Sequence, residues 1–280
     1  MPGRLYLCGT PIGNLEDVTL RLLRVLGEVD LIAAEDTRRT RKLLTHHGIR
    51  GKLVAYHQAN ERRQTHYLLE LLRKGSRIAL VSDGGMPGVS DPGYRITKAC
   101  ISEGVPVEVI PGPSAILTAL VASGLPTARF CFEGFLPRSP GDRARRLESI
   151  AADDRTLVVF EAPTRVRATL ESMLAVFGDR PAALARELTK VHEEVMRGTI
   201  SEVLSSLSEQ PLGEIVIVVE GAGQHENELN SAIDFARALV ATGSPKSKAA
   251  AEASARFDAP RRSVYEGLLD QPGEKGSQED

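Results

Sequence analysis

The chain has 280 residues, enough to bury the core of one large domain or of two medium ones, so folding needs neither a disulfide framework nor a structural metal. Its formal net charge of −2 gives no overall attraction to nucleic acid, and any basic surface has to be local. Cys8, Cys100 and Cys131 lie far apart among apolar residues, which predicts reduced, core-packed thiols in a cytoplasmic protein. No stretch approaches membrane-spanning length, so we expect a soluble protein that has no membrane partner.

Residues 1–125 alternate short β-branched runs with amphipathic helical windows, a pattern typical of a parallel sheet connected by crossover helices. The predicted strands are residues 4–8, 29–34, 52–56, 77–82 and 105–110. Between them, residues 18–27 and 65–75 carry apolar residues at helical spacing and end at a glycine. These residues predict an N-terminal α/β domain over 1–125.

The pattern begins again near Pro126, which predicts a second α/β domain over residues 126–224. Its predicted strands are residues 129–135, 156–162, 182–187, 194–198 and 214–221. Residues 164–178 read as one of the helices between them. The expected fold class is therefore two α/β domains with mainly parallel sheets and a cleft between the domains.

The last part of the chain is polar and then helical. Residues 225–270 predict a small helical module, with short helices at 246–257 and 261–269. Ser244 with Pro245, and Asp258 with Pro260, supply a capping residue and then a proline at each helix start. Residues 271–280 predict a disordered tail.

The loop "SDGGMPGVSDPG" follows the fourth predicted strand, where ligands bind in open parallel sheets. Its glycines allow the backbone to approach a ligand, and its two prolines stiffen the loop. Asp83 could accept hydrogen bonds from hydroxyls or face a positive charge, although Asp83 and Asp91 could equally cap turns and helix starts. The loops after the first, second and fifth strands would surround the same cleft.

Several common sites are excluded. No lysine follows the glycines as a phosphate-binding P-loop requires, and the dinucleotide pattern GxGxxG is absent. No GxSxG elbow supports a serine hydrolase. The six histidines show no zinc-ligand spacing, so no metal is expected.

Eight motifs occur in an order that is similar to a known family. They are "TPIGNLEDVTLR", "AAEDTRRTRKLL", "VSDGGMPGVSDPGYR", "IPGPSAILTALVASGLP", "FEGFLPR", "EAPTR", "ARELTK" and "GEIVIVVEG". Over residues 4–222 the chain resembles the ribosomal RNA branch of the tetrapyrrole methylase family, whose members 2'-O-methylate a cytidine of 16S ribosomal RNA in the small subunit. The resemblance implies an S-adenosylmethionine-dependent methyltransferase, usually a homodimer, with the donor S-adenosyl-L-methionine bound between two α/β domains.

The same resemblance implies a set of donor-binding residues. They are Pro11, Ile12, Gly13, Asp83, Gly84, Gly85, Met86, Ser114 and Ala115 of the first domain, with Ala162 and Ala185 of the second. Methyl transfer requires the donor carbon, its sulfur and the attacking oxygen in line, so positioning supplies much of the rate acceleration.

A ribose hydroxyl is a weak nucleophile at neutral pH, so a carboxylate would help to remove its proton. Asp36 and Glu187 are the predicted catalytic residues and Glu35 is a further candidate, although each could simply pair with a neighbouring arginine. Local cations would hold RNA phosphates, and an aromatic ring could stack on a base. The predicted RNA contacts are Arg38, Arg39, Arg41, Phe135, Arg138, Arg165 and Arg186.

Two other functions stay open. A corrin or porphyrin methyltransferase would share fold and donor, but that branch begins with a GxGxGD loop where this chain has "GTPIGN". An RNA-binding assembly factor would have lost the donor site, whereas the loop at 82–93 is intact. The C-terminal helices carry five cations and are compatible with either RNA contact or packing on a neighbour.

Overall fold

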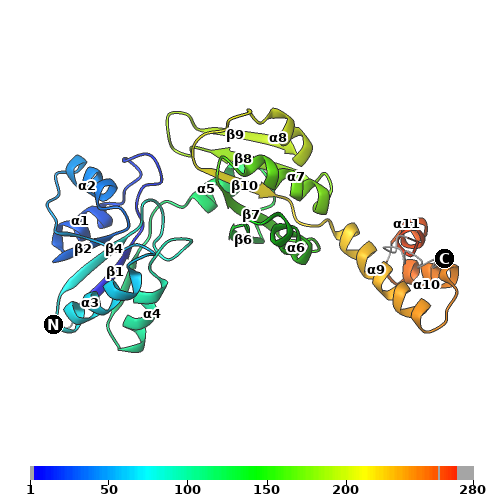
Figure 1. Cartoon of the computed structure of the whole chain (residues 1–280), viewed down its shortest axis with the longest axis horizontal. Coiled ribbons are helices and arrows are strands. Elements are labelled where there is room, and N and C mark those ends of the chain that lie inside the picture. Colours follow the sequence, from blue (N-terminus) through cyan, green and yellow to red (C-terminus); the bar gives the residue numbers. More distant parts are fainter. Residues whose placement is uncertain (1–2, 258, 270–280) are drawn as a thin grey trace, which may run out of the picture.

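The computed structural model describes residues 3–257 and 259–269, with the backbone alone for 224–228. Two α/β domains lie next to each other, and a helical module lies beyond the second (Figure 1). The predicted fold class is confirmed in these main features. In the described part of the chain, no helix is both long and apolar enough to cross a membrane.

The first domain contains a five-stranded sheet in the order β3-β2-β4-β1-β5, and all its pairings are parallel. The strands are β1 (Arg4–Cys8), β2 (Leu31–Ala34), β3 (Leu53–Ala55), β4 (Arg77–Val81) and β5 (Val107–Ile110). The helices are α1 (Leu20–Glu28), α2 (Thr37–His46), α3 (Glu61–Arg73) and α4 (Tyr94–Ser102).

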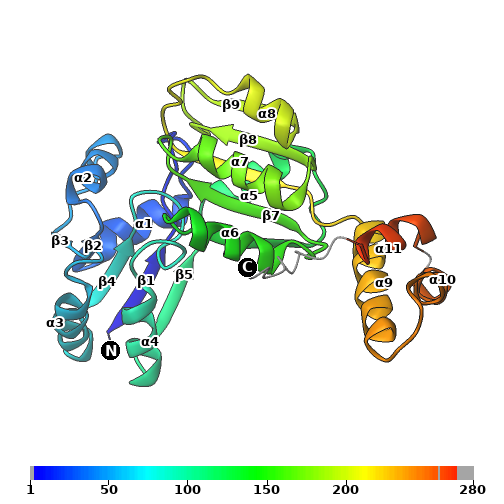
Figure 2. The same cartoon turned by 45° about the vertical axis from the view of Figure 1, so that its right-hand side comes forward.

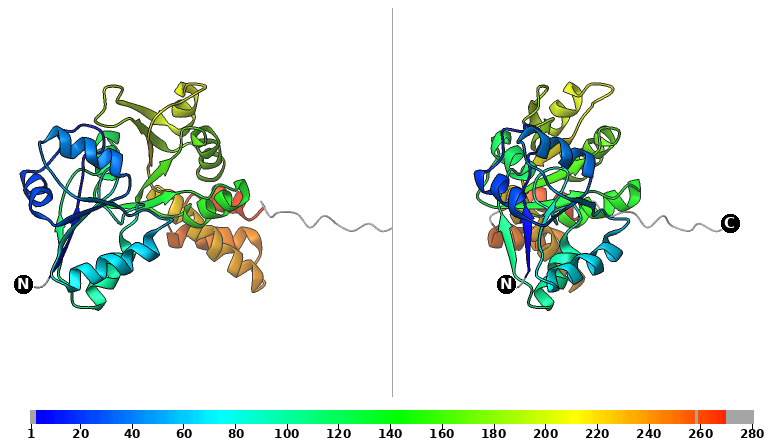
Figure 3. Two further views of the ribbon diagram at one scale, coloured as in Figure 1. Left: turned by 60° about the vertical axis from the view of Figure 1, so that its left-hand side comes forward. Right: turned by 90° about the vertical axis from the view of Figure 1, so that its left-hand side faces the viewer.

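Strand side chains alternate between two apolar layers, as expected for a sheet covered on both faces. Ile78 and Leu80 pack with α3 and α4, whereas Ala79 and Val81 pack with α1 and α2. Figure 3 shows these helix pairs on opposite sides of the sheet. The loops that follow the strands therefore gather at one edge.

The second sheet has the order β6-β7-β10-β8-β9 and is mixed. Its strands are β6 (Phe130–Phe135), β7 (Thr156–Glu161), β8 (Pro181–Arg186), β9 (Glu194–Thr199) and β10 (Ile215–Val219). Only β6 and β7 pair in parallel, so the expected mainly parallel sheet is wrong here. Residues 187–193, which join β8 to β9, are too few for a parallel crossover.

Four helices cover this sheet. They are α5 (Ala115–Ser123), α6 (Pro140–Ile150), α7 (Val166–Phe177) and α8 (Ile200–Ser206). Residues of α6, α7 and α8 share one apolar cluster, and α5 packs on the other face through Ala119 and Leu120. Figure 2 shows α6, α7 and α8 along the second sheet. The range of α5 falls within the first domain predicted from the sequence, yet this helix belongs to the core of the second sheet.

The C-terminal module consists of α9 (Gln224–Ala241), α10 (Lys246–Phe257) and α11 (Arg261–Gly267). The two short helices agree with the sequence, but α9 was not predicted as a separate helix. The module has its own alanine-rich core, which includes Ala232, Ala249 and Val264. Asp258 and the predicted tail at 271–280 lie outside the described residues.

Candidate functional site

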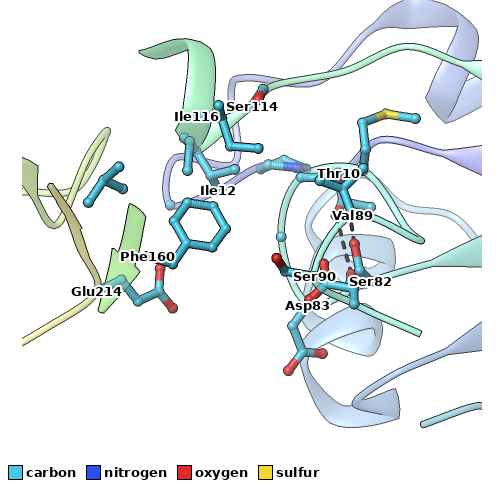
Figure 4. A pocket seen from close by; sticks show the side chains of 18 of the residues that line it. Thr10, Ile12, Ser82, Asp83, Val89, Ser90, Ser114, Ile116, Phe160 and Glu214 are labelled. Carbon is cyan, nitrogen blue, oxygen red and sulfur yellow. Dashed lines mark hydrogen bonds between the residues drawn. The ribbon is translucent and has the colours of Figure 1, made fainter. Parts of the chain in front are cut away.

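A pocket of about 800 Å³ lies between the loops of the first domain and one edge of the second sheet. Its first-domain wall includes residues 10–13, 82–86 and 89–91, and residues 114–116 lead into α5. Residues 160–163 and 213–216 form the opposite wall. In Figure 4, Phe160 and Glu214 face Ser82, Asp83 and Ser90 across open space.

Backbone contacts fix the glycine-rich wall. Thr10 and Gly85 exchange two backbone hydrogen bonds, with N···O distances of 2.9 and 3.0 Å. Gly85 has a φ of +82°, a conformation that glycine adopts without steric cost. At the neighbouring Gly9, an added Cβ would lie 2.7 Å from the backbone nitrogen of Gly112. The loops after β1, β4 and β5 are therefore held as one backbone surface.

The ends of β2 and β4 are also linked. The Asp36 backbone N–H donates to Asp83 Oδ1 at 2.8 Å, and the Asp83 N–H donates to Glu35 Oε2 at 3.3 Å. The guanidinium of Arg39 lies 3.7 Å from Asp83 and 3.9 Å from Glu214 of the second domain. These interactions hold the carboxylate of Asp83 at the pocket wall.

Asp91 lies in an acidic part of the same pocket. Burial raises the pKa of Asp91 to about 7, and the nearby carboxylate of Glu35 adds to this effect. Burial also raises the pKa of Glu35. The N-cap of α4 is Gly93, so the helix-capping interpretation of Asp91 is not supported. At neutral pH Asp91 can therefore exchange a proton.

Ten of the eleven residues predicted to bind the donor line this pocket. They are Pro11, Ile12, Gly13, Asp83, Gly84, Gly85, Met86, Ser114, Ala115 and Ala162. Ala185 is the exception, because it lies 1% exposed in the core under α5.

The two predicted catalytic carboxylates, Asp36 and Glu187, form hydrogen bonds with neighbouring protein groups. Asp36 is the N-cap of α2 and binds the side chain of Arg38, which holds the pKa of Asp36 well below its usual range. Glu187 accepts hydrogen bonds from Lys190 Nζ at 2.8 Å and from the Glu214 N–H at 3.0 Å, and its pKa is also lowered. Neither residue lines the pocket. A carboxylate with a lowered pKa is a weak proton acceptor, so the geometry favours structural roles for both.

The predicted RNA contacts separate into two groups. Arg39 and Phe135 line the pocket, while Arg38, Arg41 and Arg138 are exposed near it on α2 and after β6. The side chains of the other two arginines bind groups of the second domain. Arg165 donates to the Leu136 carbonyl at 2.7 Å, and Arg186 donates to Glu194 at 2.5 Å.

Sequence reasoning did not find Phe160, Lys190 and Glu214, which also line the pocket. Phe160 lies at the end of β7, where a strand-end argument could have found it. Glu214 comes just before β10, and β10 runs antiparallel to β7 with Ile215 opposite Glu161. The start of β10 therefore meets the pocket, which the assumption of a parallel sheet could not predict.

Comparison with known proteins agrees with this architecture. Residues 4–204 match the family model for tetrapyrrole (corrin/porphyrin) methylases. The chain belongs to the tetrapyrrole methylase family. It is 47% identical over 220 residues to "Ribosomal RNA small subunit methyltransferase I" of Thermotoga maritima, covering 78% of this chain and 99% of that protein. The protein of the same name from Escherichia coli O157:H7 is 44% identical over 275 residues, covering 97% and 96%.

Solved structures share the fold of this family member. Uroporphyrin-III-C-methyltransferase from Thermus thermophilus has a TM-score of 0.55 and 26% identity, covering 77% of this chain and 94% of that one. Diphthine synthase has a TM-score of 0.59 at 18% identity, covering 78% and 90%. The latter similarity concerns the fold alone.

Proposed function

We propose that this protein transfers a methyl group from S-adenosyl-L-methionine to the ribose 2'-oxygen of a cytidine in 16S ribosomal RNA of the small subunit. The observation that carries this proposal is the assembly of ten motif residues around one pocket, in a chain similar over nearly its full length to ribosomal RNA methyltransferases. The proposal implies a cytoplasmic location, because ribosomes are assembled in the cytoplasm.

The pocket fits the donor in size and in chemistry. Its volume of about 800 Å³ lies in the range of small-molecule sites. Asp83 and Glu214 would complement a cationic sulfonium, and Ile12, Ile116 and Phe160 would contact an apolar ring. When bound, the donor supplies an electrophilic methyl group, so the protein has to position the acceptor and hold its proton. Among the described residues, no cluster of three or more His, Cys, Asp or Glu side chains is arranged to hold a metal.

A tetrapyrrole is the alternative substrate, because a solved structure with this fold is a uroporphyrin-III methyltransferase. Sequence identity favours RNA as the substrate, because the chain is 43–47% identical to the ribosomal RNA methyltransferases and 26% identical to the uroporphyrin-III methyltransferase. Arg39 and Lys42 on the pocket wall would also suit a phosphate backbone.

We also propose that two copies of the chain associate. Apolar side chains are exposed at the start of α1, on the edge strand β5 and on α5, including Leu20, Val109 and Val121. Association of two copies would remove such side chains from water. Light scattering of the purified protein should give twice the chain mass, and the mass of a single chain would contradict this part of the proposal.

The test of function supplies labelled donor together with one of two acceptors, small ribosomal subunits lacking this modification or a reduced tetrapyrrole. We expect label in subunit RNA only, and Asp83→Ala should reduce transfer at least 100-fold because it removes the wall carboxylate and its bond to α2. Transfer to the tetrapyrrole alone would overturn the RNA assignment.

A further inference from the structure

A second, smaller pocket of about 280 Å³ lies at the same edge of the first sheet. Its lining includes Gln58, Glu61, Asp91, Tyr94, Arg95 and Lys98. Gln58 follows β3, Glu61 begins α3, and Tyr94, Arg95 and Lys98 lie in the first half of α4, directly after the loop at 82–93 that contains Asp91. Asp91 lines both pockets and is therefore their shared wall.

The smaller pocket combines an aromatic ring with cations. Tyr94 is 69% exposed, although large aromatic side chains are usually buried. Lys98 Nζ lies 6.0 Å from the centre of the Tyr94 ring, and Arg95 Nε lies 3.8 Å from Glu61 Oε2. An exposed ring beside two cations suits a stacked base with its phosphate.

Hydrogen bonds to Glu61 position the residues around this pocket. Glu61 Oε1 accepts hydrogen bonds from the Gly93 N–H and from the hydroxyl of the buried Tyr56, both at 3.2 Å. These bonds connect the start of α3 to the start of α4. Within the linking loop, Ser90 has a φ of +62°, which is uncommon for a residue with a side chain. The hydrogen bond to Gly93 links this loop to α3, and Asp91 lies between the two pockets.

We propose that the smaller pocket binds a nucleotide of single-stranded RNA next to the methylated one, and that Asp91 between the pockets accepts the proton of the attacking 2'-hydroxyl. This inference rests on the proposed function and specifies its substrate site. Arg95 and Lys98 bind the phosphate, Tyr94 stacks on the base, and the target ribose lies over Asp91.

The step balances with Asp91 as the only proton acceptor. The O–H bond breaks as the proton moves to the Asp91 carboxylate, the ribose oxygen forms a bond to the methyl carbon, and the electron pair of the breaking C–S bond stays on sulfur. The charged groups near Asp91 are Glu35, Asp83 and Glu214, and the Ser82 side chain forms a hydrogen bond with it. Glu61, Arg95 and Lys98 line the smaller pocket. The three carboxylates near Asp91 favour its protonated state, so it can hold the transferred proton until release.

The first test removes the RNA contacts. In Arg95→Ala/Lys98→Ala, the KM for small subunits should rise at least about 10-fold, and the slope of log affinity against log salt should fall by about 1.4, since two phosphate contacts are lost. Tyr94→Ala should raise KM about 10-fold through lost stacking. Donor affinity should stay unchanged in both.

The matched control is Lys52→Ala/Lys74→Ala, which removes two exposed cations at the opposite, amino-terminal edge of the same sheet. It should keep the wild-type KM and salt slope. If the control and the pocket variant change the KM and the salt slope equally, the effect comes from net charge alone, and the proposed RNA site is wrong.

The second test concerns Asp91. Asp91→Asn should lower kcat by about 10²- to 10⁴-fold at an unchanged KM for subunits, and Asp91→Glu should recover part of the loss. Binding of a cationic donor should also release about half a proton per site at pH 7, because a nearby cation lowers the pKa of Asp91. Calorimetry in buffers of different ionisation enthalpy should detect this release in the wild type and find it reduced in Asp91→Asn.

The outcomes separate the two proposals. If the wild-type protein methylates no RNA, the proposed function fails whatever the variants do. If it methylates RNA and the Asp91→Asn and Arg95→Ala/Lys98→Ala variants match it in kcat, KM and proton release, only the inference about the second pocket fails.

Discussion

Asp83 and Asp91 belong to the same loop, yet their surroundings give them different chemistry. Asp83 accepts a backbone hydrogen bond from Asp36 and lies close to the Arg39 guanidinium. Asp91 is partly buried, forms a side-chain hydrogen bond with Ser82, and lies near the carboxylates of Glu35, Asp83 and Glu214. The carboxylate of Asp83 is therefore held in place by these partners, whereas Asp91 can gain and lose a proton near neutral pH.

This difference predicts a pH dependence of stability. The pKa of Asp91 is about 7 in the folded protein and about 4 in an unfolded chain, so the folded state binds the extra proton between these values. The stabilising effect is complete below pH 4 and is lost as the pH rises through 7. The amide that replaces the carboxyl group in the Asp91→Asn variant cannot ionise, so this variant does not lose stability as the pH rises. It should melt at least about 2 °C above wild type at pH 8. Melting curves from pH 5 to 8 check this, and parallel curves for both proteins would contradict it.

Gly13 predicts a different kind of effect, at the contact between the domains. An added Cβ would lie 2.6 Å from Lys190 Cγ and 2.8 Å from the Leu188 carbonyl of the second domain. Gly13→Ala should therefore displace this contact and weaken donor binding at least about 10-fold, as measured by calorimetry. Gly27→Ala in α1 is the control, since its Cβ would meet no atom within 4 Å. Equal donor affinity in both variants would show that the close contact is unimportant.

At the scale of elements, the sequence predicted the strands and the donor-side loops well. Short apolar runs such as β1 and β4, and the proline and glycine loops behind them, are local features that reading along the chain detects. Strand direction in the second sheet depends on which distant strands pair, and no local pattern records that. Lys190 and Glu214 were missed for this reason, and the residues of α5 were included in the first domain although they pack on the second sheet.

The start of α2 allows a direct test of the two roles open to Asp36. As an N-cap, Asp36 can be replaced by asparagine, which accepts the same hydrogen bond. Asp36→Asn should keep methyl transfer within about threefold of wild type, while Asp36→Ala should cost about 1 kcal/mol of folding free energy. Urea unfolding and a transfer assay measure both. Loss of transfer in a stably folded Asp36→Asn protein would instead identify Asp36 as the base.

At the scale of the whole molecule, both α/β domains line the main pocket, whereas the C-terminal helices form a separate core. The Thermotoga maritima protein matches this chain over 220 residues, which are 78% of this chain and 99% of that protein. We therefore predict that the two α/β domains bind the donor without the C-terminal module.

A shortened chain ending at residue 222 tests this division. It should fold cooperatively and bind the donor with wild-type affinity, because every described residue of the main pocket lies before residue 217. Cations of the module are partly used internally, as with Arg256 over the ring of Phe235 and Arg262 with Glu266. We expect the KM for subunits to rise no more than about threefold. Loss of donor binding in the folded, shortened protein would contradict this account.

The most direct test of the central claim is to map the methyl group. Small ribosomal subunits from cells lacking this enzyme would be incubated with the protein and labelled S-adenosyl-L-methionine, and the RNA would then be hydrolysed with alkali. A 2'-O-methyl group blocks cleavage at its own linkage, so we predict one alkali-resistant, labelled cytidine in 16S RNA. Label on a base, or no label in RNA despite measurable donor binding, would contradict the account.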